Sequence, residues 1–97
     1  MAVSVLVPTP LRNLTQGQDT VEVEATNVSA LVDALEAGYP GMGGRLRGDD
    51  GVLRRFINIY VNDEDIRFLS GAETPLKEGD QVSIVPAIAG GLGAGGK

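Results

Sequence analysis

The last nine residues of the chain have the composition that most strongly indicates a functional segment. This segment, Ala89-Gly90-Gly91-Leu92-Gly93-Ala94-Gly95-Gly96-Lys97, contains five glycines. Its glycines match the start of a phosphate-binding loop (Gly91-x4-Gly96-Lys97) and a dinucleotide fingerprint (Gly91-x-Gly93-x-x-Gly96). Both motifs work only when a helix follows the glycines and points its N-terminus at the phosphates, and the sequence offers no helix there. We therefore expect no nucleotide site, and a glycine-rich segment that neither packs a core nor holds one conformation.

The rest of the chain lacks the side chains that most enzymes use. It contains no Cys and no His, so it has no thiolate nucleophile, no Cys/His zinc site and no Ser-His or Cys-His dyad. Aromatic residues make up only 4% of the sequence, which predicts a modest aliphatic core with little room for a buried cofactor. We expect a protein that is not an enzyme by itself and that holds no cofactor.

The charge balance narrows the class of partner. A formal net charge of -5 argues against nucleic acid, which is bound through Lys and Arg that neutralise phosphates. A basic groove on a partner protein is a better match. The N-terminal residues have neither the charged leader of a signal peptide nor the apolar length of a membrane span, so we expect no membrane partner and a cytoplasmic location.

Two clusters of charged residues need a separate interpretation. The acidic run Asp63-Glu64-Asp65 does not complete the pattern of a calcium-binding loop, and we expect a solvated or partner-facing turn without a metal. A basic cluster surrounds a glycine-rich stretch and consists of Arg45, Arg47, Arg54 and Arg55. In so acidic a chain we expect these arginines to be solubilising or internally paired.

The first half of the chain predicts a hairpin followed by a helix. Residues 2–8 are apolar and β-branched and should form a strand that stops near Val7, because two prolines follow. A turn over residues 15–18 should lead to an alternating strand over residues 21–25. The apolar spacing then changes to a helical stripe at Val28, Leu31, Val32 and Leu35. Thr26, Asn27 and Ser29 are candidate N-caps, and Gly38, in a left-handed C-cap, and Pro40 should end the helix.

The second half predicts a loop and three more strands. Residues 41–51 contain five glycines without an apolar period, and we expect a mobile surface loop. Residues 56–61 should form a strand with Ile57, Ile59 and Val61 on one face, followed by a turn at 62–65, a brief pairing at 66–68 and a last strand at 81–86. This order is that of the β-grasp fold, an α+β architecture in which one main helix crosses a mixed sheet. We expect a single domain over residues 1–88 and a flexible tail over 89–97.

A diglycine directly after the last strand of a β-grasp domain, as at Gly90-Gly91, is typical of ubiquitin-like proteins. Residues 55–68, Arg-Phe-Ile-Asn-Ile-Tyr-Val-Asn-Asp-Glu-Asp-Ile-Arg-Phe, and residues 78–91, Glu-Gly-Asp-Gln-Val-Ser-Ile-Val-Pro-Ala-Ile-Ala-Gly-Gly, carry a closer likeness. The chain resembles the thiocarboxylate-forming sulfur carriers of bacterial cysteine, thiamin and molybdopterin synthesis, and most of all the cysteine-biosynthesis carriers.

This resemblance implies a function that depends on other proteins. An adenylating enzyme related to the ubiquitin-activating enzymes would join the Gly91 carboxylate to AMP, and a sulfur donor would then displace AMP to leave a thiocarboxylate. A sulfur-accepting biosynthetic enzyme, for the cysteine-type carriers a pyridoxal-phosphate synthase, would consume it. Gly90 and Gly91 would thread the partner's active site, while Phe56, Tyr60, Asp63 and Glu64 are the expected partner-binding residues.

The chain departs from the family in having six residues, 92–97, after Gly91. The resemblance implies that a zinc metallopeptidase related to the deubiquitinating metalloproteases trims such extended carriers. Two alternatives are that Gly95-Gly96 is the working pair, with only Lys97 to remove, and that residues 92–97 are not native. We favour Gly91, because Gly90-Gly91 occupies the place that the family pattern Pro-x-x-x-Gly-Gly gives it.

Two other classes of function stay open. A ubiquitin-like modifier would transfer its activated glycine to lysines of target proteins, and the tail sequence does not separate it from a sulfur carrier. A β-grasp module that only binds partners would not need Gly90 and Gly91. The sequence also leaves the sulfur-receiving pathway open among cysteine, thiamin, molybdopterin and secondary metabolites.

Overall fold

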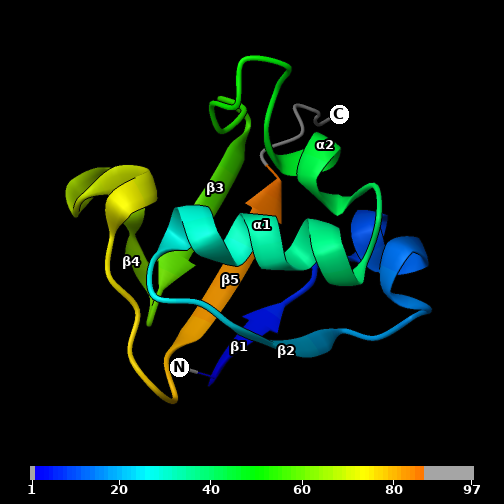
Figure 1. The fold of residues 1–97 in the computed structure, drawn as a ribbon, viewed down its shortest axis with the longest axis horizontal. Helices are drawn as coiled ribbons and strands as arrows, with labels where there is room; N and C mark the ends of the chain where they lie inside the picture. The colour runs from blue at the N-terminus through cyan, green and yellow to red at the C-terminus, as the bar shows by residue number, and fades with distance from the viewer. Residues whose placement is uncertain (1, 87–97) are drawn as a thin grey trace, which may run out of the picture.

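The protein forms one five-stranded mixed sheet crossed by a helix (Figure 1). The computed structural model describes residues 2–86, so the predicted tail lies outside the described residues. The strands are β1 (Ala2–Leu6), β2 (Thr20–Glu24), β3 (Ile57–Val61), β4 (Glu64–Asp65) and β5 (Gln81–Pro86). Their order is β2-β1-β5-β3-β4, with β1 and β5 parallel and the other neighbours antiparallel. Together with helix α1 (Val28–Gly38), this arrangement confirms the predicted β-grasp fold.

The core lies between α1 and one face of the sheet. The predicted helical stripe is fully buried, since Val28, Leu31, Val32 and Leu35 are each 0% exposed. Strand β3 alternates as predicted, with Ile57, Ile59 and Val61 buried. Burying a side chain of this size contributes roughly 1.5–3 kcal/mol relative to leaving it exposed, so the two periodic patterns supply much of the driving force for the fold.

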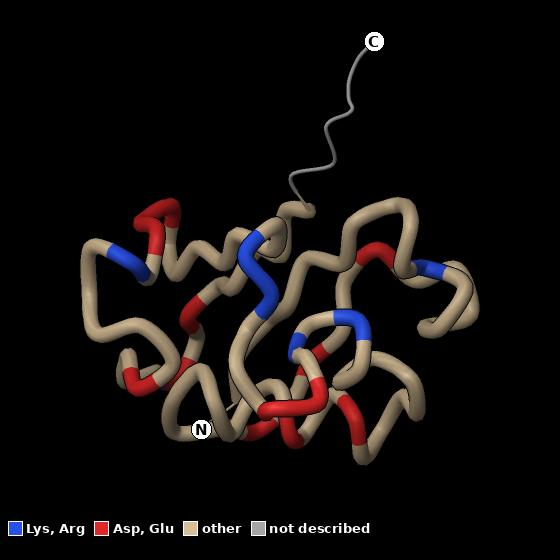
Figure 2. Tube along the Cα trace, turned by 90° about the horizontal axis from the view of Figure 1, so that it is seen from above, with Lys and Arg blue, Asp and Glu red and all other residues tan. Residues whose placement is uncertain are grey.

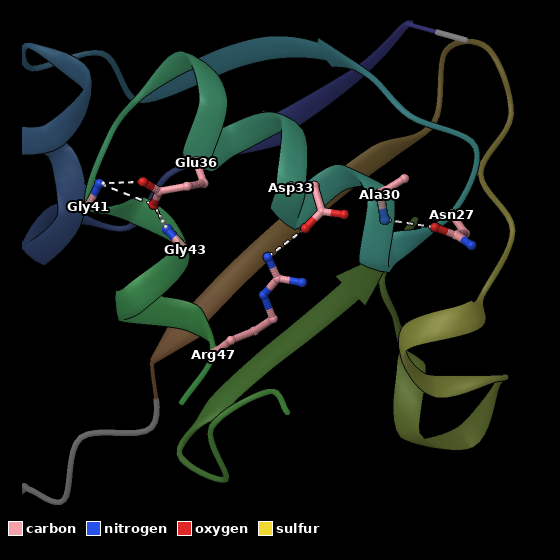
Figure 3. A network of polar contacts seen from close by, with 7 residues as sticks. All are labelled: Asn27, Ala30, Asp33, Glu36, Gly41, Gly43 and Arg47. Atoms are coloured by element: carbon pink, nitrogen blue, oxygen red, sulfur yellow. Dashed lines mark hydrogen bonds and ion pairs between the residues drawn. The ribbon is translucent and has the colours of Figure 1, made fainter. Parts of the chain in front are cut away.

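Helix α1 begins as predicted and ends differently. The Asn27 side chain is the N-cap, and its Oδ1 accepts a hydrogen bond from the Ala30 N–H at 2.8 Å (Figure 3). The predicted left-handed C-cap at Gly38 is wrong, because Gly38 is the last helical residue and Tyr39 follows as the cap with φ −137°. The left-handed conformation occurs instead at Gly41, with φ 101°.

The prediction that residues 41–51 form a surface loop is wrong for the first half of that segment. Residues Met42–Leu46 form a short helix, α2, and both Met42 and Leu46 are 0% exposed. The carboxylate of Glu36 on α1 fixes this helix by accepting hydrogen bonds from the backbone N–H groups of Gly41 and Gly43, the latter at 2.8 Å (Figure 3). A side chain at Gly43 would place its Cβ only 2.9 Å from Glu36 Oε1, so the close approach of the two helices requires glycine there.

Two further connections differ from the prediction. A 3-10 helix, η1 (Thr9–Thr15), precedes the turn predicted between β1 and β2 and buries Leu11. Ile66–Phe68, predicted to pair briefly, is the 3-10 helix η2, and the pairing with β3 falls on β4 instead. The Asp65 side chain caps η2 by accepting a hydrogen bond from the Arg67 N–H at 2.8 Å. This local hydrogen bond stabilises a turn in place of a longer strand.

Candidate functional site

Strand β5 positions the predicted reactive tail. It is the central strand of the sheet, with β1 on one side and β3 on the other. Its pairing with β3 sets Val82 opposite Val61 and Pro86, the last described residue, opposite Ile57. The segment that carries Gly90 and Gly91 therefore starts at a point fixed by two neighbouring strands, beside the beginning of β3. Gly90 and Gly91 themselves lie outside the described residues.

Around this point the sheet presents an uncovered face. Side chains alternate along a strand, so the residues between the buried ones point away from α1. In β3 and β5 the opposed pairs on this face are Asn58 with Val85 and Tyr60 with Ser83. Val85 is 43% exposed, an apolar side chain next to the start of the tail. Sequence analysis selected Tyr60 but not Val85. The alternation of Val82 and Ile84 with their neighbours in β5 already indicated that Val85 lies on the face away from the core.

Phe56 lies directly before β3 and is 50% exposed. Together with Pro10, Leu11, Arg45, Ile57 and Pro86 it lines a recess of about 120 Å³. Pro86 pairs with Ile57, so this recess adjoins the start of the tail.

The acidic residues lie at the other end of β3. Asn62 and Asp63 have positive φ values of 51° and 74° and form a two-residue turn of the kind that suits a right-handed sheet twist. Asp63 and Glu64 are exposed. A strand rises roughly 3.3 Å per residue, so the length of β3 separates them from Phe56. The structure thus separates the predicted partner-binding residues, with Phe56 next to the Ile57–Pro86 pair, Tyr60 within β3, and Asp63 and Glu64 beyond the far end of β3.

The third acidic residue of the run plays a structural part. The Asp65 side chain is only 8% exposed and forms an ion pair with Arg67 at 2.7 Å. The side-chain hydrogen bond from Arg67, reinforced by the Arg67 backbone N–H, holds the pKa of Asp65 below its usual value. The run therefore does not converge on one point, and residues 2–86 contain no group of three potential ligands that could hold a metal ion.

A second polar network fixes the beginning of β5, and sequence analysis missed it. Asp80 Oδ1 accepts a hydrogen bond from Asn62 Nδ2 at 3.0 Å, and its Oδ2 accepts one from the Lys77 N–H at 2.8 Å. The Asn62 side-chain bond, and then the Lys77 backbone bond, lower the pKa of Asp80. Asn62 Oδ1 also accepts a hydrogen bond from the Gln81 N–H at 3.0 Å, which ties the β3–β4 turn to the start of β5.

The charged side chains are spread over the molecule. Figure 2 shows acidic positions spread across the width of the described chain, with basic positions between them. Internal pairing is confirmed for one member of the arginine cluster, because Arg47 pairs with Asp33 at 2.6 Å. Arg54 donates hydrogen bonds to the Gly44 carbonyl without an ion pair among the described residues. Within residues 2–86, Arg45 and Arg55 form no ion pair. No helix in this part of the chain is long and apolar enough to cross a membrane.

Comparison with known proteins agrees with this geometry. The sulfur carrier protein CysO of Mycobacterium tuberculosis is 47% identical over 93 residues, covering 94% of this chain and all of the relative. A chain in the crystal structure of the Amycolatopsis orientalis BexX/CysO complex superposes with a TM-score of 0.86 at 45% identity, covering 92% of this chain and 99% of that one. The small archaeal modifier protein 3 of Haloferax volcanii is 39% identical over 71 residues, which is 73% of this chain and 75% of the relative.

The family match is continuous through the fold and into the tail. Residues 5–91 match the ThiS family. This span begins within β1, includes the rest of the described strands, and ends at the second glycine of the predicted reactive pair. The chain therefore belongs to the ThiS family.

Proposed function

We propose that this chain is a sulfur carrier that holds sulfur as a thiocarboxylate on Gly91. The observation that carries the proposal is a β-grasp sheet whose central strand leads directly into a diglycine, at the point where the ThiS family match ends. The 47% identity to the CysO sulfur carrier favours cysteine biosynthesis as the pathway. The BexX/CysO complex fits a secondary-metabolite role as well.

The chemistry follows from the weakness of a carboxylate as an electrophile. One oxygen of the Gly91 carboxylate attacks the α-phosphorus of ATP, and pyrophosphate leaves. The resulting acyl adenylate has AMP as a good leaving group. A hydrosulfide ion provided by the sulfur donor attacks the carbonyl carbon, the C–O bond to AMP breaks and AMP leaves, and loss of the S–H proton gives the thiocarboxylate. Glycine at positions 90 and 91 lets this end enter a narrow active site because it carries no side chain.

Three partner enzymes follow from this chemistry. An adenylating enzyme related to the ubiquitin-activating enzymes binds ATP and catalyses the adenylation and the sulfur transfer. A zinc metallopeptidase removes residues 92–97, which follow the family match. A sulfur-accepting biosynthetic enzyme consumes the thiocarboxylate. The chain itself acts as the carried substrate in each step.

The surface that these partners recognise includes the uncovered sheet face and the tail. Phe56 and Val85 offer exposed apolar area beside the start of the tail, and Tyr60 extends this face along β3. Asp63 and Glu64, at the far end of β3, would act at longer range by steering association. Residues 1–88 form the domain that presents this surface, and residues 89–97 form the reactive arm.

A second candidate function is protein modification. The 39% identity to small archaeal modifier protein 3 favours it, and it uses the same activated Gly91. The two functions differ only in the nucleophile that attacks the activated Gly91 carbonyl, which is sulfur for a carrier and a lysine amine of a target protein for a modifier.

Mass spectrometry of the protein isolated from its own cells distinguishes the two candidates. A carrier yields a chain ending at Gly91 with a sulfur-for-oxygen mass increase. A modifier yields target peptides that bear an isopeptide-linked remnant of this chain on lysine, which after trypsin is residues 78–91 because Lys77 is the last basic residue before Gly91. If the isolated chain carries neither change and still ends at Lys97, the proposal is wrong.

A further inference from the structure

The outer edge of β3 is only partly covered. Strand β4 has two residues and pairs only with Tyr60 and Val61. Among the described residues, no strand pairs with residues 57–59 on that side, where the Ile57 N–H donates to the Arg54 carbonyl at 3.0 Å and the backbone of Ile59 remains open to a partner. Beside it lies a recess of about 400 Å³ with an apolar floor formed by Leu53, Ile57, Ile59 and Ile66. We call this recess the β3-edge groove.

The rim of the β3-edge groove is positively charged. It holds Arg54, Arg55 and Arg67 against the single carboxylate of Asp65, so three of the eight basic residues in a chain of net charge -5 gather here. Asp65 neutralises Arg67. Arg54 donates to the Gly44 carbonyl, a neutral group, and forms no ion pair within residues 2–86. Arg55 is exposed and has no ion pair within the described residues.

We propose that the β3-edge groove binds an extended, acidic segment of a partner protein, which adds as a strand beside β3. An exposed strand edge is a template for such addition, in which backbone hydrogen bonds give affinity and side-chain pockets give specificity. Alternate residues of the segment would place apolar side chains over Ile57 and Ile59 and carboxylates beside Arg54 and Arg55. Charge complementarity selects an acidic segment over a basic one.

The other edge of the same sheet provides an internal comparison. Strand β2 is also an edge strand, and its exposed residues include Glu22 and Glu24. These carboxylates would repel an acidic segment, because like charges disfavour the wrong partner. An acidic strand should therefore select the β3 edge although both edges are open. This inference does not depend on whether Gly91 carries sulfur.

Nuclear magnetic resonance titration of the full chain tests the proposal. The probe is a synthetic eight-residue peptide of alternating Glu and Val, and the matched control peptide has Lys in place of Glu. We expect the acidic peptide to shift the amide signals of Ile57, Ile59 and Ile66 and to leave those of β2 unchanged. The basic peptide should not shift the signals of the groove.

Substitutions locate the binding charge. Arg55→Glu should weaken binding of the acidic peptide by about tenfold, which corresponds to about 1.4 kcal/mol. Arg45→Glu makes an equal change in charge at an exposed site outside the groove. It should change the affinity for the acidic peptide by less than about twofold. Arg55→Lys should retain most of the binding. Unchanged amide dispersion would show that each variant is folded.

Several results would overturn the proposal. They are the absence of amide shifts at millimolar acidic peptide, shifts centred on β2, and equal affinity for the Arg55→Glu and Arg45→Glu variants. Inorganic phosphate that produces the same shifts as the peptide would also contradict it, because the groove would then be a simple anion site.

Discussion

At the scale of single residues, the carboxylate of Asp80 connects the strand that leads into the tail to the turn at the far end of its neighbour. It accepts hydrogen bonds from Asn62 and from the Lys77 N–H, and these bonds lower its pKa from the ordinary value of 3.8. A carboxyl whose pKa is lower in the folded state stabilises the fold above its unfolded pKa. That contribution is lost as the pH falls through the lower, folded-state pKa.

Replacing Asp80 with Asn should therefore destabilise the protein at neutral pH, and the deficit should shrink as the pH falls below about 3.8. Urea unfolding of both proteins across this pH range measures the difference. Asp49→Asn is the control, because Asp49 is exposed and forms no ion pair within the described residues. A deficit for Asp80→Asn that stays constant with pH would mean that the ionised carboxylate is not what stabilises the turn.

At the scale of the elements, α2 shows where sequence reasoning reached its limit. Strands β1, β2, β3 and β5 and helix α1 were predictable because each carries an apolar pattern over five or more residues, as in the stripe that ends at Leu35. The two-residue strand β4 has no such pattern and was predicted as part of a turn. Helix α2 has only two buried apolar residues, Met42 and Leu46, amid glycines that disfavour a helix. It forms because Glu36 and Asp33 of α1 bind it, and such tertiary contacts leave no periodic signal.

The same contrast holds for the candidate site. The position of Gly91 after the last strand could be predicted, because it depends only on chain order. Strand β3 separates Phe56 from Asp63 and Glu64. The strand predicted over residues 56–61 already placed these residues at its two ends. The groove beside β3 could not be predicted, because it results from β4 ending early where Asp65 caps η2.

The burial of α2 predicts a clear mutational contrast. Met42→Ala should lower the free energy of unfolding by roughly 2–5 kcal/mol, the usual range for truncating a buried Met or Leu. Arg45→Ala, on the exposed side of the same helix, should change it by less than about 0.5 kcal/mol. Chemical denaturation measures both. Equal effects would show that residues 41–51 are the surface loop that the sequence predicted.

The acidic turn predicts a change in association rate. The double variant Asp63→Asn with Glu64→Lys should slow binding to the adenylating enzyme several-fold at low salt. Asn is chosen at position 63 because it tolerates the positive φ found there. High salt should remove the difference. Asp49→Asn with Asp19→Lys makes the same change in net charge elsewhere. If both double variants bind at the same rate, Asp63 and Glu64 form only a solvated turn.

At the scale of the whole molecule, the buried apolar cluster of the described residues runs from Val3 to Ile84, and the sequence continues no apolar pattern after Ile88. A chain truncated after Ala89 should therefore melt within about 4 °C of the full chain, a difference below about 1 kcal/mol for a domain of this size. Thermal unfolding followed by circular dichroism gives the comparison. A larger loss would show that residues beyond Ala89 pack against the domain.

The central claim is that Gly91 is the residue that becomes activated and that residues 92–97 must first be removed. Leu92 would bring a branched side chain into the segment that must thread the partner's active site. A chain ending at Gly91 should gain AMP and then sulfur, its Gly91→Phe variant should fold but gain neither, and the full chain should gain neither until trimmed.

Intact mass spectrometry after incubation with ATP, the adenylating enzyme and sulfide tests this claim most directly. The account predicts a sulfur-for-oxygen mass increase on the trimmed chain alone. An equal increase on the untrimmed chain, at Lys97, would contradict it.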